Sequence, residues 1–152
     1  MNKFLGLAFL AASLPLTALA QAAQNYPFAG TWKLNVEKSK FSPGPAPKSA
    51  TVTIGEDRKV DYQAETADGQ TIKWSVNMKS DGTPADISGM EGSTVTEKSI
   101  DDRTVEHTWK SPKSTQTGKA VLAKNGKTMV YTLTGTTDDG KPLHNREIWD
   151  KE

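Results

Sequence analysis

The chain has 152 residues, with 19 lysines and arginines against 18 aspartates and glutamates, which gives a formal net charge of +1. A charge so close to zero, with the two signs interspersed, excludes recognition of nucleic acid or an anionic membrane by bulk charge. Because the chain has no cysteine, it has neither a disulfide framework nor a cysteine to lipidate.

The first 20 residues have the features of a secretory signal peptide. Lys3 supplies a positive charge, residues 4–19 are almost wholly apolar, and small residues stand before Gln21 where a signal peptidase reads them. An alternative cut lies after Ala22. A membrane anchor is the rival interpretation, but the polar sequence that follows lacks a stop-transfer flank. We therefore expect one domain, residues 21–152, in the periplasm or outside the cell, with no stable membrane anchor.

After the signal peptide, the dominant pattern is the alternation of apolar and polar side chains. The clearest run is residues 71–78, in which every even position is apolar and every odd one polar; this period indicates a strand with one buried face. Weaker alternation surrounds Val52, Val60 and Met129, and Asp-Gly and Asn-Gly turn signals separate the runs. The pattern predicts an antiparallel meander of about eight or nine strands.

Turn chemistry predicts the register of one hairpin late in the chain. A two-residue type I′ turn at Asn125-Gly126 pairs Leu122 with Met129 and makes the apolar faces of the two strands coincide.

An earlier hairpin needs a longer loop. A three-residue loop at residues 67–69, with Gly69 in the left-handed conformation, pairs Tyr62 with Trp74. A two-residue loop would instead place Tyr62 opposite Ser75 and put apolar side chains on opposite faces, so we predict the three-residue loop.

A meander of this many strands removes its open edges most simply by closing into an up-and-down β-barrel, with an open two-sheet sandwich as the rival. A barrel of eight to ten strands is filled by side chains or holds one small ligand. The Pro-rich residues 42–47 are predicted to cross the surface or form a lid. Residues 82–92 are predicted to be irregular and to cover one mouth of the barrel.

Several of these features resemble the lipocalin pattern: Gly30-x-Trp32 on the first strand, one domain of this length, and Arg146 on the last strand. More closely, the runs TWKLNVEKSKF, IDDRTVEHTWK and KNGKTMVYTLTGT resemble a group of small secreted bacterial proteins of lipocalin-like type. The chain has no match to the mid-chain Thr-Asp-x-x-Tyr pattern of true lipocalins, so a lipocalin-like or wider calycin barrel is the expected fold. The resemblance implies an apolar cup, closed at one end by Trp32 with Arg146 laid across it.

Trp32 admits two interpretations. As an indole at the start of the first strand it fills the closed end of the barrel, with its N–H bonded to a nearby acceptor. The alternative is direct contact with a ligand. A guanidinium stacked on an aromatic ring is more often structural than a ligand clamp, so we interpret Trp32 and Arg146 together as a plug.

The last strand has apolar residues on both faces, and its orientation is predicted from Ile148. If Ile148 points inward, His144 and Arg146 do so too, whereas Glu147 and Trp149 point outward. The opposite choice would bury Trp149 and Glu147.

His107 is the most informative polar residue, because Val105 and Trp109 share its face of the strand. A buried neutral imidazole with one hydrogen bond is one interpretation; a contact to a ligand head group, or to a metal or haem iron, is the other. His144 is the one further histidine, and with no cysteine in the chain we predict no metal and no cofactor.

No catalytic signature is present in the sequence. There is no Gly-x-Ser-x-Gly elbow, no Ser-His-Asp arrangement and no Gly-rich phosphate loop. We therefore expect a protein that is not an enzyme. Catalysis would gain support if His107 proved to lie within hydrogen-bond reach of a carboxylate or hydroxyl inside an open pocket.

The sequence thus predicts non-enzymatic binding of a small hydrophobic or amphipathic molecule in the cup of the barrel. The alternative is a protein-interaction module with a solid barrel, in which loops 41–48 and 82–92 meet a partner. A void of several hundred cubic ångströms would favour the cup. The residues predicted to contact the ligand are Tyr62, Trp74, Met78, His107, Trp109 and Tyr131.

Overall fold

The computed structural model describes residues 25–152, so the predicted signal peptide lies outside the described residues. These residues form ten β-strands and no helix long and apolar enough to cross a membrane. The strands are β1 (Gly30–Leu34), β2 (Ser49–Ile54), β3 (Lys59–Glu65), β4 (Thr71–Asn77), β5 (Ala85–Asp86), β6 (Thr94–Asp101), β7 (Thr104–Lys110), β8 (Thr115–Leu122), β9 (Thr128–Thr136) and β10 (Pro142–Lys151).

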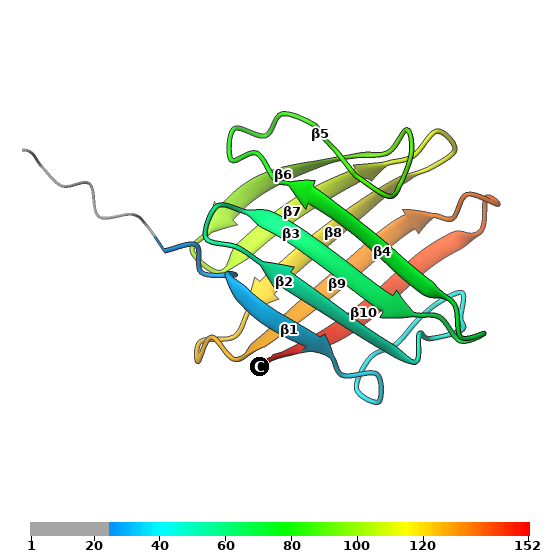
Figure 1. Ribbon diagram of the computed structural model, residues 1–152, viewed down its shortest axis with the longest axis horizontal. Coiled ribbons are helices and arrows are strands. Elements are labelled where there is room, and N and C mark those ends of the chain that lie inside the picture. Colours follow the sequence, from blue (N-terminus) through cyan, green and yellow to red (C-terminus); the bar gives the residue numbers. More distant parts are fainter. Residues whose placement is uncertain (1–24) are drawn as a thin grey trace, which may run out of the picture.

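The ten strands form one antiparallel sheet that curls into a nearly closed barrel (Figure 1), in the order β4-β3-β2-β1-β10-β9-β8-β7-β6-β5. The remaining seam, between β4 and the segment after β5, is bridged by two backbone hydrogen bonds of 2.9 Å between Ser75 and Ser88. The predicted up-and-down barrel is therefore confirmed, and the open sandwich is excluded.

The strand count exceeds the predicted eight or nine because residues 82–92 are not wholly irregular. This stretch contains the two-residue strand β5, whose Ala85 pairs with Val95 of β6. Ala85 and Ile87 are both buried. The stretch therefore completes the barrel wall at the seam.

The register predicted for the β3–β4 hairpin is confirmed. Tyr62 lies opposite Trp74, and the loop is closed by the Thr66 and Gln70 backbones, with Gly69 at a φ of 86°. That left-handed backbone conformation is the reason a glycine stands there.

The register of the β8–β9 hairpin is also confirmed, since Leu122 lies opposite Met129. The predicted type I′ turn is wrong. Ala123 bonds to Thr128, which makes the loop four residues long, and of its central residues Gly126 alone has a positive φ. A type I′ turn needs two such residues in succession.

The Pro-rich connection between β1 and β2 crosses the surface as predicted. Its proline-containing residues, 42–47, are largely exposed. After β1, which pairs with β10, the chain forms further backbone hydrogen bonds with the same strand. Lys40 lies opposite Arg146, and the Ser42 carbonyl accepts a hydrogen bond from His144 N–H.

The orientation predicted for β10 is wrong. Trp149 lies opposite the inward Leu34 and Met129, and Glu147 lies opposite the inward Tyr131. Trp149 and Glu147 therefore point into the barrel, whereas His144 and Arg146 are exposed on the outside.

Ile148 misled the prediction because it is buried on the outer face of β10. Its backbone N–H bonds to Ser39 Oγ and its carbonyl to Asn35 N–H, so residues 35–39 cover it. A prediction from the alternation of apolar and polar residues assumes that only one face of the strand is buried. It cannot distinguish an apolar residue buried on the outer face, such as Ile148, from one in the core.

Candidate functional site

The inner surface of the barrel lines a cavity of about 110 Å³. All six residues that the sequence predicted as ligand contacts line it. The full lining consists of Tyr26, Phe28, Val52, Ile54, Val60, Tyr62, Trp74, Met78, Glu97, Val105, His107, Trp109, Ala120, Met129, Tyr131, Glu147 and Trp149. The walls are aromatic and apolar, with two carboxylates and one imidazole as the charged or titratable groups other than tyrosine.

The aromatic side chains pack against one another around the cavity. Tyr62 and Trp74, cross-strand partners in the hairpin described above, stack with ring centroids 4.8 Å apart. The edge of Trp109 meets Trp74 at 5.4 Å, and Trp109 Nε1 donates a hydrogen bond of 2.7 Å to the Tyr131 hydroxyl. These offset and edge contacts are favourable arrangements for aromatic rings, so the walls hold their shape around the void.

Gly118 of β8 makes room for one of these rings. A Cβ atom at this position would collide with the hydroxyl and ring of Tyr131. The ring therefore lies flat across β8, and its hydroxyl reaches Trp109.

Trp32 closes one end of the barrel and does not line the cavity. It is completely buried, and its Nε1 donates a hydrogen bond of 2.8 Å to the Phe28 carbonyl. The predicted plug is confirmed, but its predicted cover is wrong: Arg146 is exposed on the outer face of β10. Lys151 takes that place, with Nζ 5.2 Å from the centroid of the Trp32 ring.

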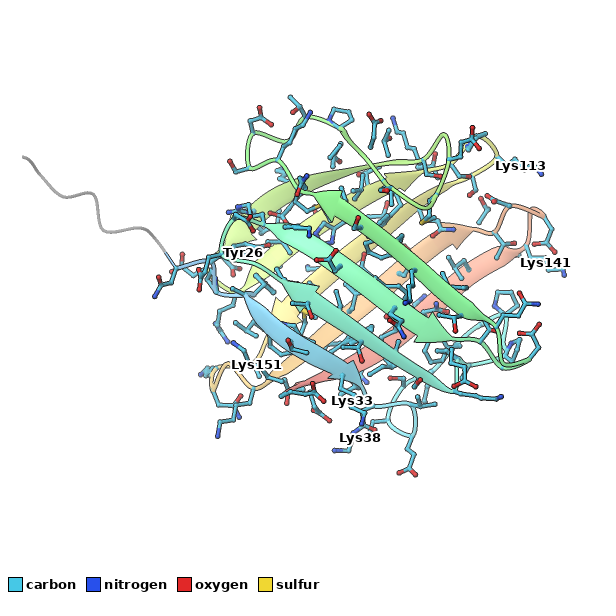
Figure 2. The ribbon with its side chains drawn as sticks, viewed as in Figure 1. Tyr26, Lys33, Lys38, Lys113, Lys141 and Lys151 are labelled. Carbon is cyan, nitrogen blue, oxygen red and sulfur yellow. The ribbon has the colours of Figure 1, made fainter. Side chains whose placement is uncertain are left out.

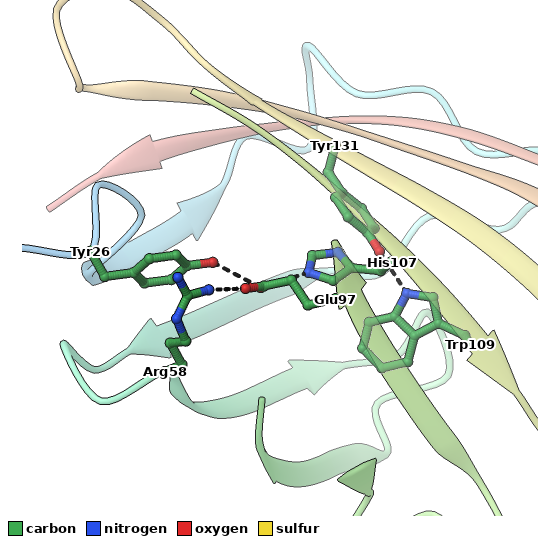
Figure 3. Close-up of polar contacts among 6 residues, drawn as sticks. All are labelled: Tyr26, Arg58, Glu97, His107, Trp109 and Tyr131. Atoms are coloured by element: carbon green, nitrogen blue, oxygen red, sulfur yellow. Dashed lines mark hydrogen bonds and ion pairs between the residues drawn. The ribbon is translucent and has the colours of Figure 1, made fainter. Parts of the chain in front are cut away.

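Glu97 of β6 is a buried carboxylate with three side-chain partners (Figure 3). The Tyr26 hydroxyl donates a hydrogen bond of 2.8 Å, Arg58 forms an ion pair, and His107 Nε2 lies 3.2 Å away. Burial alone would raise the pKa of Glu97, but hydrogen bonds from His107 and Tyr26 and the positive charges nearby hold it below its usual range. Glu97 is therefore ionised and fully paired.

Arg58 reaches Glu97 from the β2–β3 turn. Its backbone has a φ of 65°, which is uncommon for any residue other than glycine and asparagine. Its guanidinium carbon lies 4.1 Å from the centroid of the Tyr26 ring. The side chain thus pairs with Glu97 and stacks on Tyr26. These two contacts stabilise the guanidinium in this position and offset the unfavourable backbone conformation of the turn.

His107 has one satisfied nitrogen and one free nitrogen. Because an ionised carboxylate only accepts hydrogen bonds, Nε2 is the donor to Glu97. Nδ1 is buried and has no hydrogen-bond partner, an uncommon condition for a buried polar atom. The imidazole is therefore held by Glu97 through Nε2, and its Nδ1 is buried without a hydrogen-bond partner.

Two consequences follow for the alternatives that the sequence left open. His107 does lie within hydrogen-bond reach of a carboxylate, which is the geometric condition stated above for a general base. A metal or haem site shared with His144 is excluded by geometry, because His144 is exposed outside the barrel. Within residues 25–152, no three histidine, aspartate or glutamate side chains gather as a metal site would require.

Glu147 is the second carboxylate of the cavity, and its surroundings differ from those of Glu97. It accepts hydrogen bonds from Trp149 Nε1 at 3.1 Å and Asn145 Nδ2 at 3.5 Å. Burial raises the pKa of Glu147 despite both bonds. Burial and the Glu147 charge together raise the pKa of Tyr62 to about 12.

A second opening lies at the end of the barrel away from Tyr26. Figure 2 shows Lys113 and Lys141, in the β7–β8 and β9–β10 hairpins, at one end and Tyr26 at the other. A pocket of about 250 Å³ lies beside these two hairpins, and Trp109 lines both this pocket and the central cavity. Trp109 therefore separates the cavity from this mouth.

A larger depression, of about 680 Å³, lies elsewhere. It is an open hollow on the outer side of β2, β3 and β4, with polar side chains such as Thr51, Gln63 and Lys73 among its lining. Its openness and polarity make it a poor place to retain an apolar ligand.

Four polar residues of the interior were missed by the sequence reasoning: Tyr26, Arg58, Glu97 and Glu147. Glu97 had a usable signal, since it stands two residues after Val95 and so shares its buried face. Glu147 was placed outside through the wrong orientation of β10. Tyr26 and Arg58 lie outside the strands, where alternation gives no signal.

No protein-family model matches the chain, and no curated protein matches it. Among solved structures, the chain is similar to a point mutant of the fluorescent protein UnaG. The TM-score is 0.57, with 17% identical residues over 83% of this chain and 96% of that chain. At this level of identity the likeness shows the fold, which is an antiparallel barrel of the calycin type. The calycin-type barrel expected from the sequence is therefore confirmed.

Proposed function

We propose that this calycin-type barrel binds one small hydrophobic or amphipathic molecule non-covalently in its central cavity, without chemical change, in the periplasm or outside the cell. The observation that carries the proposal is the cavity itself. Aromatic rings line it, and two polar side chains, His107 and Glu147, are among its lining residues. A few convergent polar groups in an apolar pocket are typical of ligand sites.

The size of the cavity limits the ligand. About 110 Å³ is below the several hundred cubic ångströms that drug-sized sites have and that the sequence-based criterion for a cup requires. It approaches the roughly 150 Å³ of an apolar cavity that holds benzene. We therefore propose a ligand no larger than one substituted ring. Long-chain fatty acids, retinoids and haem exceed this space.

Binding without catalysis is favoured by the surroundings of the His107–Glu97 pair. Glu97 is already engaged by Arg58 and Tyr26, which lowers its ability to strengthen His107 as a base. In addition, no serine, threonine or lysine is among the residues that line the cavity in the described part of the chain. A hydroxyl nucleophile of serine or threonine, or a lysine amine, beside the imidazole is thus lacking there.

The proposal can be tested by titrating the protein without its signal peptide with benzyl alcohol, a neutral single-ring probe. Three tryptophans line the cavity, so intrinsic fluorescence and calorimetry should both report one saturable site. The Ala120→Leu variant should abolish binding, because Ala120 is buried in the cavity wall and a larger side chain fills the void.

The matched control is Val121→Leu on the outer face of the same strand, where the side chain is 39% exposed; it should bind as the parent does. If no small aromatic probe binds, or if Ala120→Leu binds normally while folded, the barrel is a solid scaffold and the protein-interaction alternative replaces this proposal.

A further inference from the structure

The cavity contains two carboxylates but only one has a cationic partner. Glu97 is balanced by Arg58. Within residues 25–152, Glu147 forms no ion pair with any lysine, arginine or histidine, and its two hydrogen-bond partners are neutral. No lysine or arginine is among the residues that line the cavity. The lining therefore contains one carboxylate, Glu147, that no cationic side chain of the described residues pairs with.

Aromatic rings surround this carboxylate. Glu147 lies opposite Tyr131 in the β9–β10 ladder, and its charge contributes to raising the pKa values of Tyr62 and Tyr131. The Trp149 ring, which donates to Glu147, meets Tyr62 edge to face at 6.4 Å. Aromatic faces attract cations through their quadrupole, and more strongly once water is removed.

Glu147 is half-buried, and removing a carboxylate from water without a cationic partner is unfavourable, so proteins ordinarily avoid it or compensate it. An anionic ligand would make the site worse, because it would meet two carboxylates and no lysine or arginine in the lining. A neutral ligand would leave the charge as it is. A cationic ligand would supply the missing partner, with the rings as additional contacts.

We propose, on the basis of the binding function above, that the ligand of this barrel carries a cationic nitrogen on a small apolar body, and that Glu147 with the rings of Tyr62, Tyr131 and Trp149 recognises that cation. The ligand class is therefore a primary or methylated amine of about one ring in size. This assignment excludes fatty acids on charge as well as on size.

The test compares benzylamine with benzyl alcohol, which have nearly the same shape but differ in charge at neutral pH. With the protein lacking its signal peptide, benzylamine should bind at least about tenfold more tightly than benzyl alcohol at low ionic strength, as measured by calorimetry. Glu147→Gln, which keeps an acceptor for Trp149 Nε1, should remove most of this preference and change the benzyl alcohol affinity less than about twofold.

The matched control is Glu106→Gln, which removes one negative charge from the outer face of β7 and should leave the preference intact. If the unsubstituted protein binds benzyl alcohol as tightly as benzylamine, the assignment of a cationic ligand is wrong, while the binding function stands. Because this comparison uses only the unsubstituted protein, it does not depend on whether a variant folds. The assignment would also be wrong if a folded Glu147→Gln variant still preferred benzylamine over benzyl alcohol as strongly as the parent does. If neither probe binds, the binding function itself fails.

Discussion

The two carboxylates inside this barrel lie on the same inner surface but are treated in opposite ways. Around Glu97, the tyrosine, arginine and histidine partners satisfy the charge, and next to them Trp32 closes the barrel end with its N–H bonded. Around Glu147, the partners are two neutral N–H groups, and the side chain lines the cavity.

Under the proposed binding function, the difference separates a stabilising polar network from the part of the cavity that contacts the ligand. A fully paired buried network contributes to the uniqueness and stability of the fold, whereas an incompletely paired group costs stability. Substitutions at the Trp32 end should therefore change mainly the free energy of unfolding, and substitutions at Glu147 should change mainly binding.

The largest loss of stability is expected for Trp32→Ala. Removal of a completely buried indole and its hydrogen bond to Phe28 should lower the free energy of unfolding by about 3–5 kcal/mol, measured by urea denaturation. Lys33→Ala, at the next, exposed position, should change it by less than about 0.5 kcal/mol. Because Trp32 does not line the cavity, the folded fraction of Trp32→Ala should still bind benzyl alcohol; loss of binding would contradict the separation of the two regions.

A smaller loss is expected for Glu97→Gln. The amide cannot neutralise Arg58, and it leaves the Tyr26 hydroxyl and His107 with a weaker acceptor in a buried setting. We expect a loss of about 2–3 kcal/mol in the free energy of unfolding. The same substitution at Glu147 should cost less than about 1 kcal/mol, since no cation is left unpaired there. Equal losses in the two variants would show that the two carboxylates do not differ in role.

Much of the fold could be predicted from the sequence because strand alternation and loop length together restrict the register. The even-numbered apolar positions of β4 and the three-residue loop before it sufficed to place Tyr62 opposite Trp74. That pair, with Trp109 and His107 on β7, already defined most of the aromatic wall. Long-range closure of the barrel followed from the need to satisfy the strand edges.

The polar half of the site could not be predicted, for two physical reasons. Tyr26 and Arg58 stand in a terminal segment and a turn, so their meeting at Glu97 depends on three-dimensional closure and not on a local period. In β10, apolar residues occur on both faces, because residues 35–39 bury Ile148 from outside. The assumption that only one face of a strand is buried therefore predicted the wrong orientation of β10 and placed Glu147 outside the barrel.

The smallest expected effect concerns the pH dependence of stability, and it should have opposite signs at the two carboxylates. The pKa of Glu97 is lowered in the folded protein, so its contribution is present above the ordinary glutamate pKa of about 4.3 and is lost as pH falls through the lowered value. The pKa of Glu147 is raised, so the folded protein holds that proton more tightly than the unfolded chain does. Its contribution is therefore present below about pH 4.3 and is lost as pH rises through the raised value.

Each contribution can be isolated by subtracting the pH profile of the matching glutamine variant from that of the parent, using urea unfolding at a series of pH values. For Glu147, the parent should lose stability relative to Glu147→Gln as pH rises above about 4.3. For Glu97, the parent should lose stability relative to Glu97→Gln as pH falls below it. Saturating benzylamine should reverse the Glu147 trend, because a bound cation stabilises the ionised carboxylate that the empty cavity disfavours. Profiles of the same sign at both positions would mean that Glu147 has a cationic partner already.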